Sequence, residues 1–119
     1  TEQDIDYVRD RTVADIEKAI DGLRVKQDEL AKRKQQLDTE AEFYKKKPMP
    51  PQLQSQMRDN EIEMKAQQAA IDGRQKEIGA VRARYEEEKT RYRELTKKKA
   101  AGGTGATAQG PAGADSRPR

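Results

Sequence analysis

Residues 43–53, FYKKKPMPPQL, hold three of the five prolines of the chain and separate two long stretches of helix-forming sequence. Proline lacks the amide hydrogen that a helix interior needs, and it biases the preceding residue away from helical geometry. The sequence on either side, from Glu2 to Tyr44 and from Gln52 to Lys99, is free of proline and rich in Lys, Gln, Glu, Ala and Leu, which favour helices. We therefore predict a helix over 2–46, a turn over 47–51 and a second helix over 52–99.

Apolar residues recur at heptad spacing in both predicted helices. In the second helix every seventh residue forms one seam column: Met57, Met64, Ile71, Ile78, Tyr85 and Tyr92. In the first helix apolar residues alternate at three and four residues from Val13 to Tyr44. This is the pattern of helices that pair in a coiled coil. The fold class expected is all-α: a long antiparallel two-helix coiled-coil hairpin over 1–100, with a proline turn and a disordered C-terminal tail.

The seam also predicts a register for the pair. Each helix has one strongly apolar column and one partly polar column. The strong column of the first helix is Ile16, Leu23, Leu30, Leu37 and Tyr44, and its weaker column is Val13, Ile20, Gln27, Lys34 and Ala41. The weaker column of the second helix is Leu53, Asn60, Gln67, Arg74, Val81, Glu88 and Leu95. The two strong columns coincide when facing residues have numbers that add to 101. Tyr44 then faces Met57, Leu37 faces Met64, and the hairpin is centred inside the turn. The same pairing puts residues 1–17, with a net charge of −4, beside residues 84–100, with a net charge of +3. Agreement between these features favours a specified fold.

The composition excludes several classes of protein. The chain has 119 residues, of which 32% are hydrophobic and 39% charged, with one Phe and no Trp, whereas globular domains are about 45–50% apolar and about 25% charged. Histidine and cysteine are absent, which removes the usual general base, the soft metal ligands and the thiol nucleophile. We predict no enzyme, no catalytic, cofactor or metal site and no small-molecule substrate.

Residues 101–119, AGGTGATAQGPAGADSRPR, differ in composition from everything before them. Glycine, proline and small residues dominate, and such segments bury too little apolar surface to offset the entropy of ordering. We predict that this tail is disordered. No apolar run approaches the roughly 18–20 residues that span a bilayer, so we expect a soluble chain. The sequence is compatible with periplasmic, secreted and cytoplasmic locations alike.

The turn and its flanks are the first candidate site. Over residues 45–58 there are four bases and no acid, next to aromatic and aliphatic side chains. One interpretation is purely structural: the lysines interact favourably with the negative end of the helix dipole, and the prolines that follow end the helix. The other is a contact surface for an anionic partner, formed by Phe43, Tyr44, Lys45, Lys46, Lys47, Met49 and Leu53.

A row of small residues on the second helix is the second candidate site. Ala66, Ala70, Gly73 and Ala80 lie beside the weak seam column. Alanine is a good helix former on any solvated face. Glycine, however, costs about 1 kcal/mol relative to alanine in a helix interior, which favours a face where another helix packs closely.

Two classes of function follow. The first is a non-enzymatic structural or adaptor coiled-coil protein that acts through protein contacts, by forming a homo-oligomer or within a larger assembly. The alternative is a charged-ligand binding module whose basic hairpin tip engages nucleic acid or an anionic membrane surface. The net charge of +3 is too balanced to indicate nucleic-acid binding by itself, so the sequence favours the first class.

Overall fold

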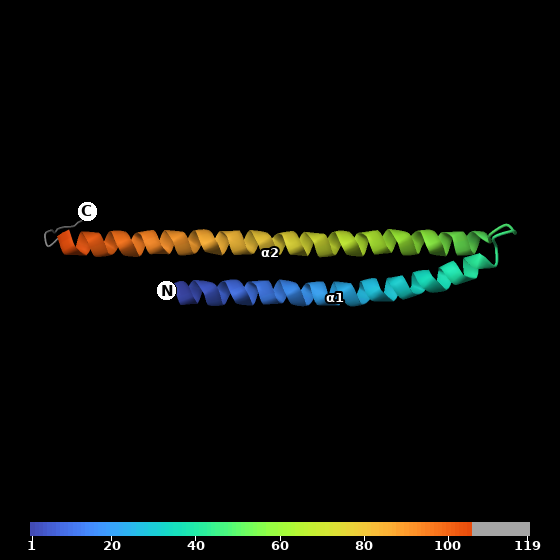
Figure 1. Cartoon of the computed structure of the whole chain (residues 1–119), viewed down its shortest axis with the longest axis horizontal. Helices are drawn as coiled ribbons and strands as arrows, with labels where there is room; N and C mark the ends of the chain where they lie inside the picture. The colour runs from blue at the N-terminus through green and yellow to red at the C-terminus, as the bar shows by residue number, and fades with distance from the viewer. Residues whose placement is uncertain (106–119) are drawn as a thin grey trace. The chain divides into compact units, whose positions relative to one another are not determined.

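The structure is a computed structural model that describes the backbone of residues 1–105 and the side chains of residues 1–100. It contains two α-helices in the order α1, Glu2–Glu42, and α2, Pro51–Gly105 (Figure 1). The prediction of an all-α helical hairpin is confirmed. Neither described helix has an apolar stretch long enough to cross a membrane.

The helix boundaries differ from the predicted ones. Helix α1 ends at Glu42 rather than at residue 46, and the connection covers 43–50. The amides of Phe43 and Tyr44 donate to the carbonyls of Glu40 and Ala41, at 3.1 and 2.9 Å. These bonds span three residues instead of four, so the chain tightens and leaves the α-helical path before it reaches the prolines.

Helix α2 begins one residue earlier than predicted and ends later. The Gln54 amide donates to the Pro50 carbonyl at 3.1 Å, so Pro51 occupies the first helical position, where its missing amide hydrogen costs nothing. At the other end α2 continues to Gly105 and includes residues 101–105, which we predicted to be disordered. The rest of that prediction, residues 106–119, lies outside the described residues.

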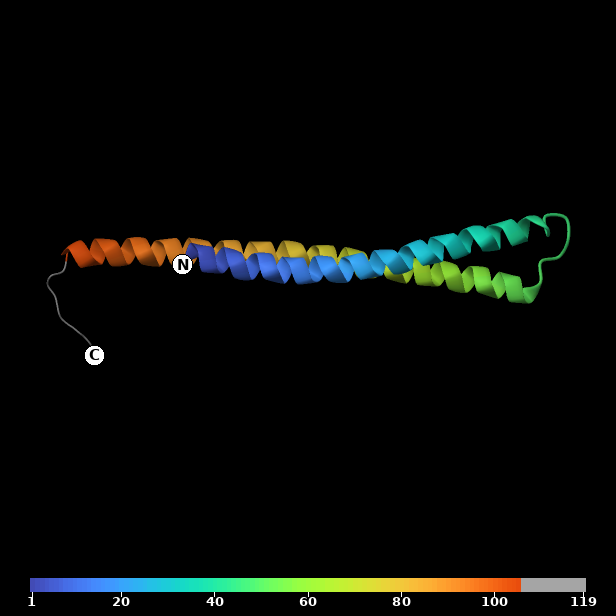
Figure 2. The same cartoon turned by 90° about the horizontal axis from the view of Figure 1, so that it is seen from below.

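The chain forms two compact units, and each contains part of both helices. Unit 2, Arg11–Val81, holds the connection and most of the antiparallel pair; α1 and α2 lie side by side there in Figures 1 and 2. Unit 1 combines Thr1–Asp10 with α2 from Arg82 onward. Each unit is described separately below.

The core of unit 2 follows the predicted seam. Val13, Ile16, Ile20, Ile71 and Ile78 form one buried cluster, with Leu23 and Val81 packed against it. Nearer the connection, Leu30, Leu37 and Leu53 are also buried. Every buried residue among those whose side chains the structure describes occupies a predicted seam position, including the one buried polar residue, Asn60.

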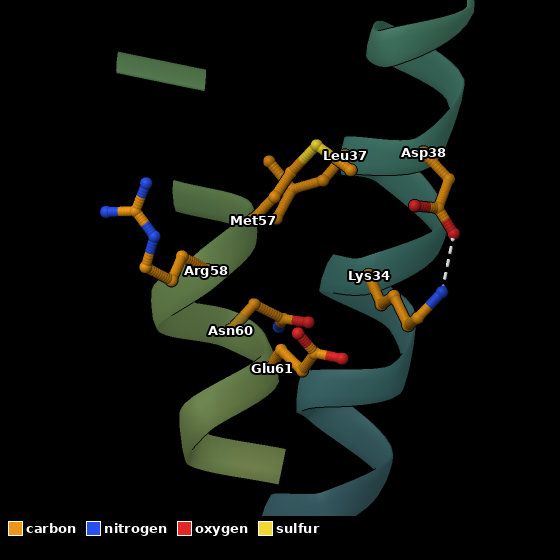
Figure 3. A pocket seen from close by; sticks show the side chains of 7 residues that line it. All are labelled: Lys34, Leu37, Asp38, Met57, Arg58, Asn60 and Glu61. Carbon is orange, nitrogen blue, oxygen red and sulfur yellow. Dashed lines mark hydrogen bonds and ion pairs between the residues drawn. The ribbon is translucent and has the colours of Figure 1, made fainter. Parts of the chain in front are cut away.

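The predicted register is wrong by one heptad. The Gln27 side chain donates to the Gln68 side chain at 2.7 Å, and Leu37 lies against Met57 (Figure 3). These pairs have numbers that add to 95 and 94, not 101. A slip of seven residues keeps strong columns opposite strong columns, so the apolar pattern alone did not exclude it. Numbers that add to 101 centre the helix pair on the Pro50–Pro51 step, whereas the observed connection, 43–50, is centred between residues 46 and 47, in agreement with the observed register.

Unit 1 confirms that the acidic start of α1 lies beside basic residues of α2. Arg93 forms an ion pair with Glu2 at 2.8 Å, and Lys89 forms one with Asp6 at 3.0 Å. The hydrogen bond from Arg93 lowers the pKa of Glu2, and the hydrogen bond from Lys89 lowers the pKa of Asp6. These charges therefore contribute to helix pairing in unit 1 while both carboxylates are ionised.

Candidate functional site

The connection between the helices, residues 43–50, forms the end of the hairpin in unit 2, and we call it the tip (Figure 2). Phe43 is 81% exposed there, more than any other large hydrophobic residue that the structure reports as exposed. It precedes the seam position of Tyr44, which is half-buried. Because the seam takes the tyrosine, the neighbouring phenylalanine points into solvent.

Three lysines follow the aromatic pair, and all three are exposed. Lys45 forms an ion pair with Glu42 at 3.2 Å between two exposed side chains, and such surface pairs contribute little to stability. Among the described residues no acidic side chain lies within ion-pair distance of Lys46 or Lys47. The positive charge of the tip is therefore available to a partner.

The structure separates the other predicted tip residues from this surface. Leu53 is only 4% exposed and belongs to the seam, so it supports the tip from inside. Met49 is half-buried, and its carbonyl accepts a hydrogen bond from the Gln54 side chain at 3.3 Å. That bond ties the connection to the first turn of α2. The accessible part of the predicted site consists mainly of Phe43 and the three lysines.

The predicted docking face on α2 is open. Ala66, Ala70, Gly73 and Ala80 are all exposed. A Cβ atom built on Gly73 would have no heavy atom within 4 Å beyond its own stretch of helix. The hairpin itself therefore gives no reason for a glycine at this position.

Sequence reasoning missed a surface hollow of about 360 Å³ between the helices (Figure 3). Its residues come from both helices of unit 2: Lys34, Leu37, Asp38, Met57, Arg58, Asn60 and Glu61. Lys34 donates a hydrogen bond to Asp38 at 2.8 Å, and this bond, with the charges of Asp38 and Glu61, raises the pKa of Lys34. Two of the charged residues at this hollow, Lys34 and Asp38, are thus paired with each other on α1.

Asn60 lies at one side of this hollow and is only 6% exposed. Its side-chain nitrogen donates to the backbone carbonyl of Leu30 at 3.0 Å, so the polar group is satisfied across the helix pair. The sequence showed a polar residue at a seam position, which is the signal that could have revealed this bond. A single buried Asn in a seam is a known means of specifying register.

The described residues offer no group of three or more Asp and Glu side chains positioned to hold a metal ion. Comparison with protein-family models, curated proteins and solved structures finds no match for this chain. Its function is therefore argued from the residues alone.

Proposed function

We propose that this helical hairpin is a non-enzymatic structural or adaptor protein that acts through protein contacts, by self-association or within a larger assembly. The observation that supports the proposal is the exposed row of small residues on α2, Ala66, Ala70, Gly73 and Ala80. The spacing of four, three and seven residues keeps this row on one face of the helix.

The helix pair covers only one face of each helix. Most of the seam in unit 2 is apolar, but Gln27, Lys34 and Asn60 interrupt it, and two helices with an interrupted seam are marginal in isolation. Packing a further helix on the row in α2 would bury additional surface. Small side chains permit the close approach that such packing needs. This contact would also give Gly73, which costs about 1 kcal/mol relative to alanine, a role that the isolated hairpin does not provide.

Sedimentation equilibrium of the wild type at several concentrations tests the proposal. We compare Ala70→Glu, on the row, with Ala31→Glu, the same change at an exposed position of α1. A carboxylate buried without a partner in an interface is strongly unfavourable, so we expect Ala70→Glu to weaken association at least about tenfold. Ala31→Glu should leave association unchanged, and circular dichroism should show equal helicity in all three proteins.

A wild type that stays monomeric near millimolar concentration would contradict the self-association form of the proposal. Equal weakening by Ala31→Glu would show that association depends on net charge instead of on the α2 row. Either result would remove the support that this row gives to self-association.

A further inference from the structure

Phe43 is exposed at the tip, although the hairpin fold does not require an exposed phenylalanine there. It lies outside both helices and next to Tyr44, which fills the seam position at this end of the pair. Exposing a phenylalanine forgoes the favourable burial that its side chain would otherwise contribute. The residue is 81% exposed, so the ring projects into solvent.

The charges of unit 2 are distributed unevenly between its tip and its shaft. Residues 43–50, the tip, contain three bases and no acid. On the shaft, residues 11–42 contain seven bases and eight acids, and residues 51–81 contain four bases and five acids. Within unit 2, a flat anionic surface therefore attracts the tip but not the nearly neutral shaft, which favours an approach with the tip first.

Single exposed aromatic rings beside lysines suit the surface of an anionic bilayer. The lysines interact with lipid phosphates and carboxylates, while an apolar side chain reaches the boundary between headgroups and acyl chains. A fluid layer accepts a projecting ring without a pocket of matching shape. Nucleic acid fits the tip less well, because three lysines release few counterions and one aromatic ring provides little stacking.

From these observations we propose that the tip is a docking site for an anionic lipid surface, into which Phe43 inserts while Lys45, Lys46 and Lys47 contact the headgroups. This contact is separate from the protein-contact face on α2. Each lysine near an anionic membrane strengthens binding about fivefold, so three lysines give a weak and salt-dependent attachment. At physiological salt the affinity of one hairpin stays weaker than micromolar.

The chain has no tryptophan, so Phe43→Trp provides a single fluorescent reporter at the tip. Ile62→Trp is the matched control, because Ile62 is also an exposed hydrophobic residue, at 58%, but lies on α2 away from the lysines. Both full-length proteins are mixed with phosphatidylcholine vesicles that contain about 30% phosphatidylserine, in about 50 mM salt, where screening is modest. We expect a shift of the emission to shorter wavelength for Phe43→Trp and none for Ile62→Trp.

The lysines are tested in the Phe43→Trp protein. Replacing Lys45, Lys46 and Lys47 by Gln should lower the partition coefficient about a hundredfold. The run Lys32, Arg33 and Lys34 on α1 gives a control with the same loss of charge, and its replacement by Gln should lower binding far less. Circular dichroism checks that each variant keeps its helicity; the tip substitutions lie outside both helices.

Three results would overturn the proposal. One is an unshifted Phe43→Trp emission at several millimolar lipid. Another is an equal loss of binding when the bases on the shaft are replaced. The third is lysine-dependent binding to poly-L-glutamate or duplex DNA that is tighter than binding to the vesicles at the same salt, which would assign the tip to an acidic protein or to nucleic acid. A shift that disappears with vesicles of phosphatidylcholine alone supports the proposal.

Discussion

Cysteine pairs at the seam give a direct test of the register. The chain contains no cysteine, so a double substitution introduces the only two thiols. In the structure Leu37 lies against Met57, whereas the register predicted from the apolar pattern alone puts Leu37 opposite Met64. We compare Leu37→Cys with Met57→Cys against Leu37→Cys with Met64→Cys.

The expected difference follows from helix geometry. A slip of one heptad displaces one helix along the other by about 10 Å, at 1.5 Å per residue. A disulfide needs Cα atoms about 4.4–6.8 Å apart, so only one of the two pairs can close without distortion. Closing the loop between residues 37 and 57 should stabilise the hairpin by about 3 kcal/mol in the chain-entropy account. This offsets the loss of about 2 kcal/mol or more from replacing Leu37, which is 1% exposed.

Mild oxidation at low protein concentration, followed by non-reducing electrophoresis and mass spectrometry, measures which pair forms. We expect the 37/57 pair to cross-link within one chain at least about tenfold faster than the 37/64 pair. Urea unfolding with and without reductant then measures the stabilisation. Single-cysteine variants control for cross-links between chains. Faster cross-linking of the 37/64 pair would refute the observed register and restore the one predicted from sequence.

Three further predictions concern stability. Replacing Asn60 by Leu should raise the free energy of unfolding by about 1 kcal/mol, because an apolar side chain replaces a buried polar one. The same change should reduce the preference for the 37/57 disulfide over the 37/64 disulfide. An unchanged preference would show that Asn60 does not specify register. Gly73→Ala should stabilise the hairpin by about 1 kcal/mol in urea unfolding, because its Cβ meets open space, and a destabilised variant would indicate a contact that the single chain lacks. The pairing of Glu2 and Asp6 contributes stability above their ordinary pKa values of 4.5 and 3.8, and this contribution is lost as pH falls through their lowered values. Heteronuclear NOE values of residues 2–10 should therefore fall as the pH is lowered from neutral to well below these ordinary values, and constant values would contradict the role of these ion pairs.

Local chemistry was sufficient to predict the two helices and their buried faces. The apolar seam positions from Val13 to Leu37 and from Leu53 to Ile78 are buried or half-buried in the structure, because a heptad repeat keeps them on one side of each helix. The ends of the helices were harder to predict. Lysines 45–47 suit a helix end, yet the backbone tightens at Phe43. The residue at which α1 ends depends on how the connection joins the two paired helices.

The candidate tip was also predicted only in part. A proline turn with an acid-free lysine run is visible in the sequence. The heptad pattern placed Leu53 in the seam as well as in the candidate contact surface, and the structure buries Leu53 while it exposes Phe43. How far each side chain reaches solvent depends on where α1 ends. The hollow beside Asn60 was missed for a related reason, since its walls come from residues of α1 and α2 that become neighbours only in the observed register.

The sequence by itself determined the helical class, the antiparallel pairing across a proline turn and the positions that face the seam, because each depends on short-range spacing and backbone preference. Only the tertiary structure decided the register. A seven-residue repeat is nearly unchanged by a seven-residue slip, so the energies of the two registers differ mainly through the length of the connection and single contacts such as Asn60 with the Leu30 carbonyl. Those contacts exist only when the two helices are brought together.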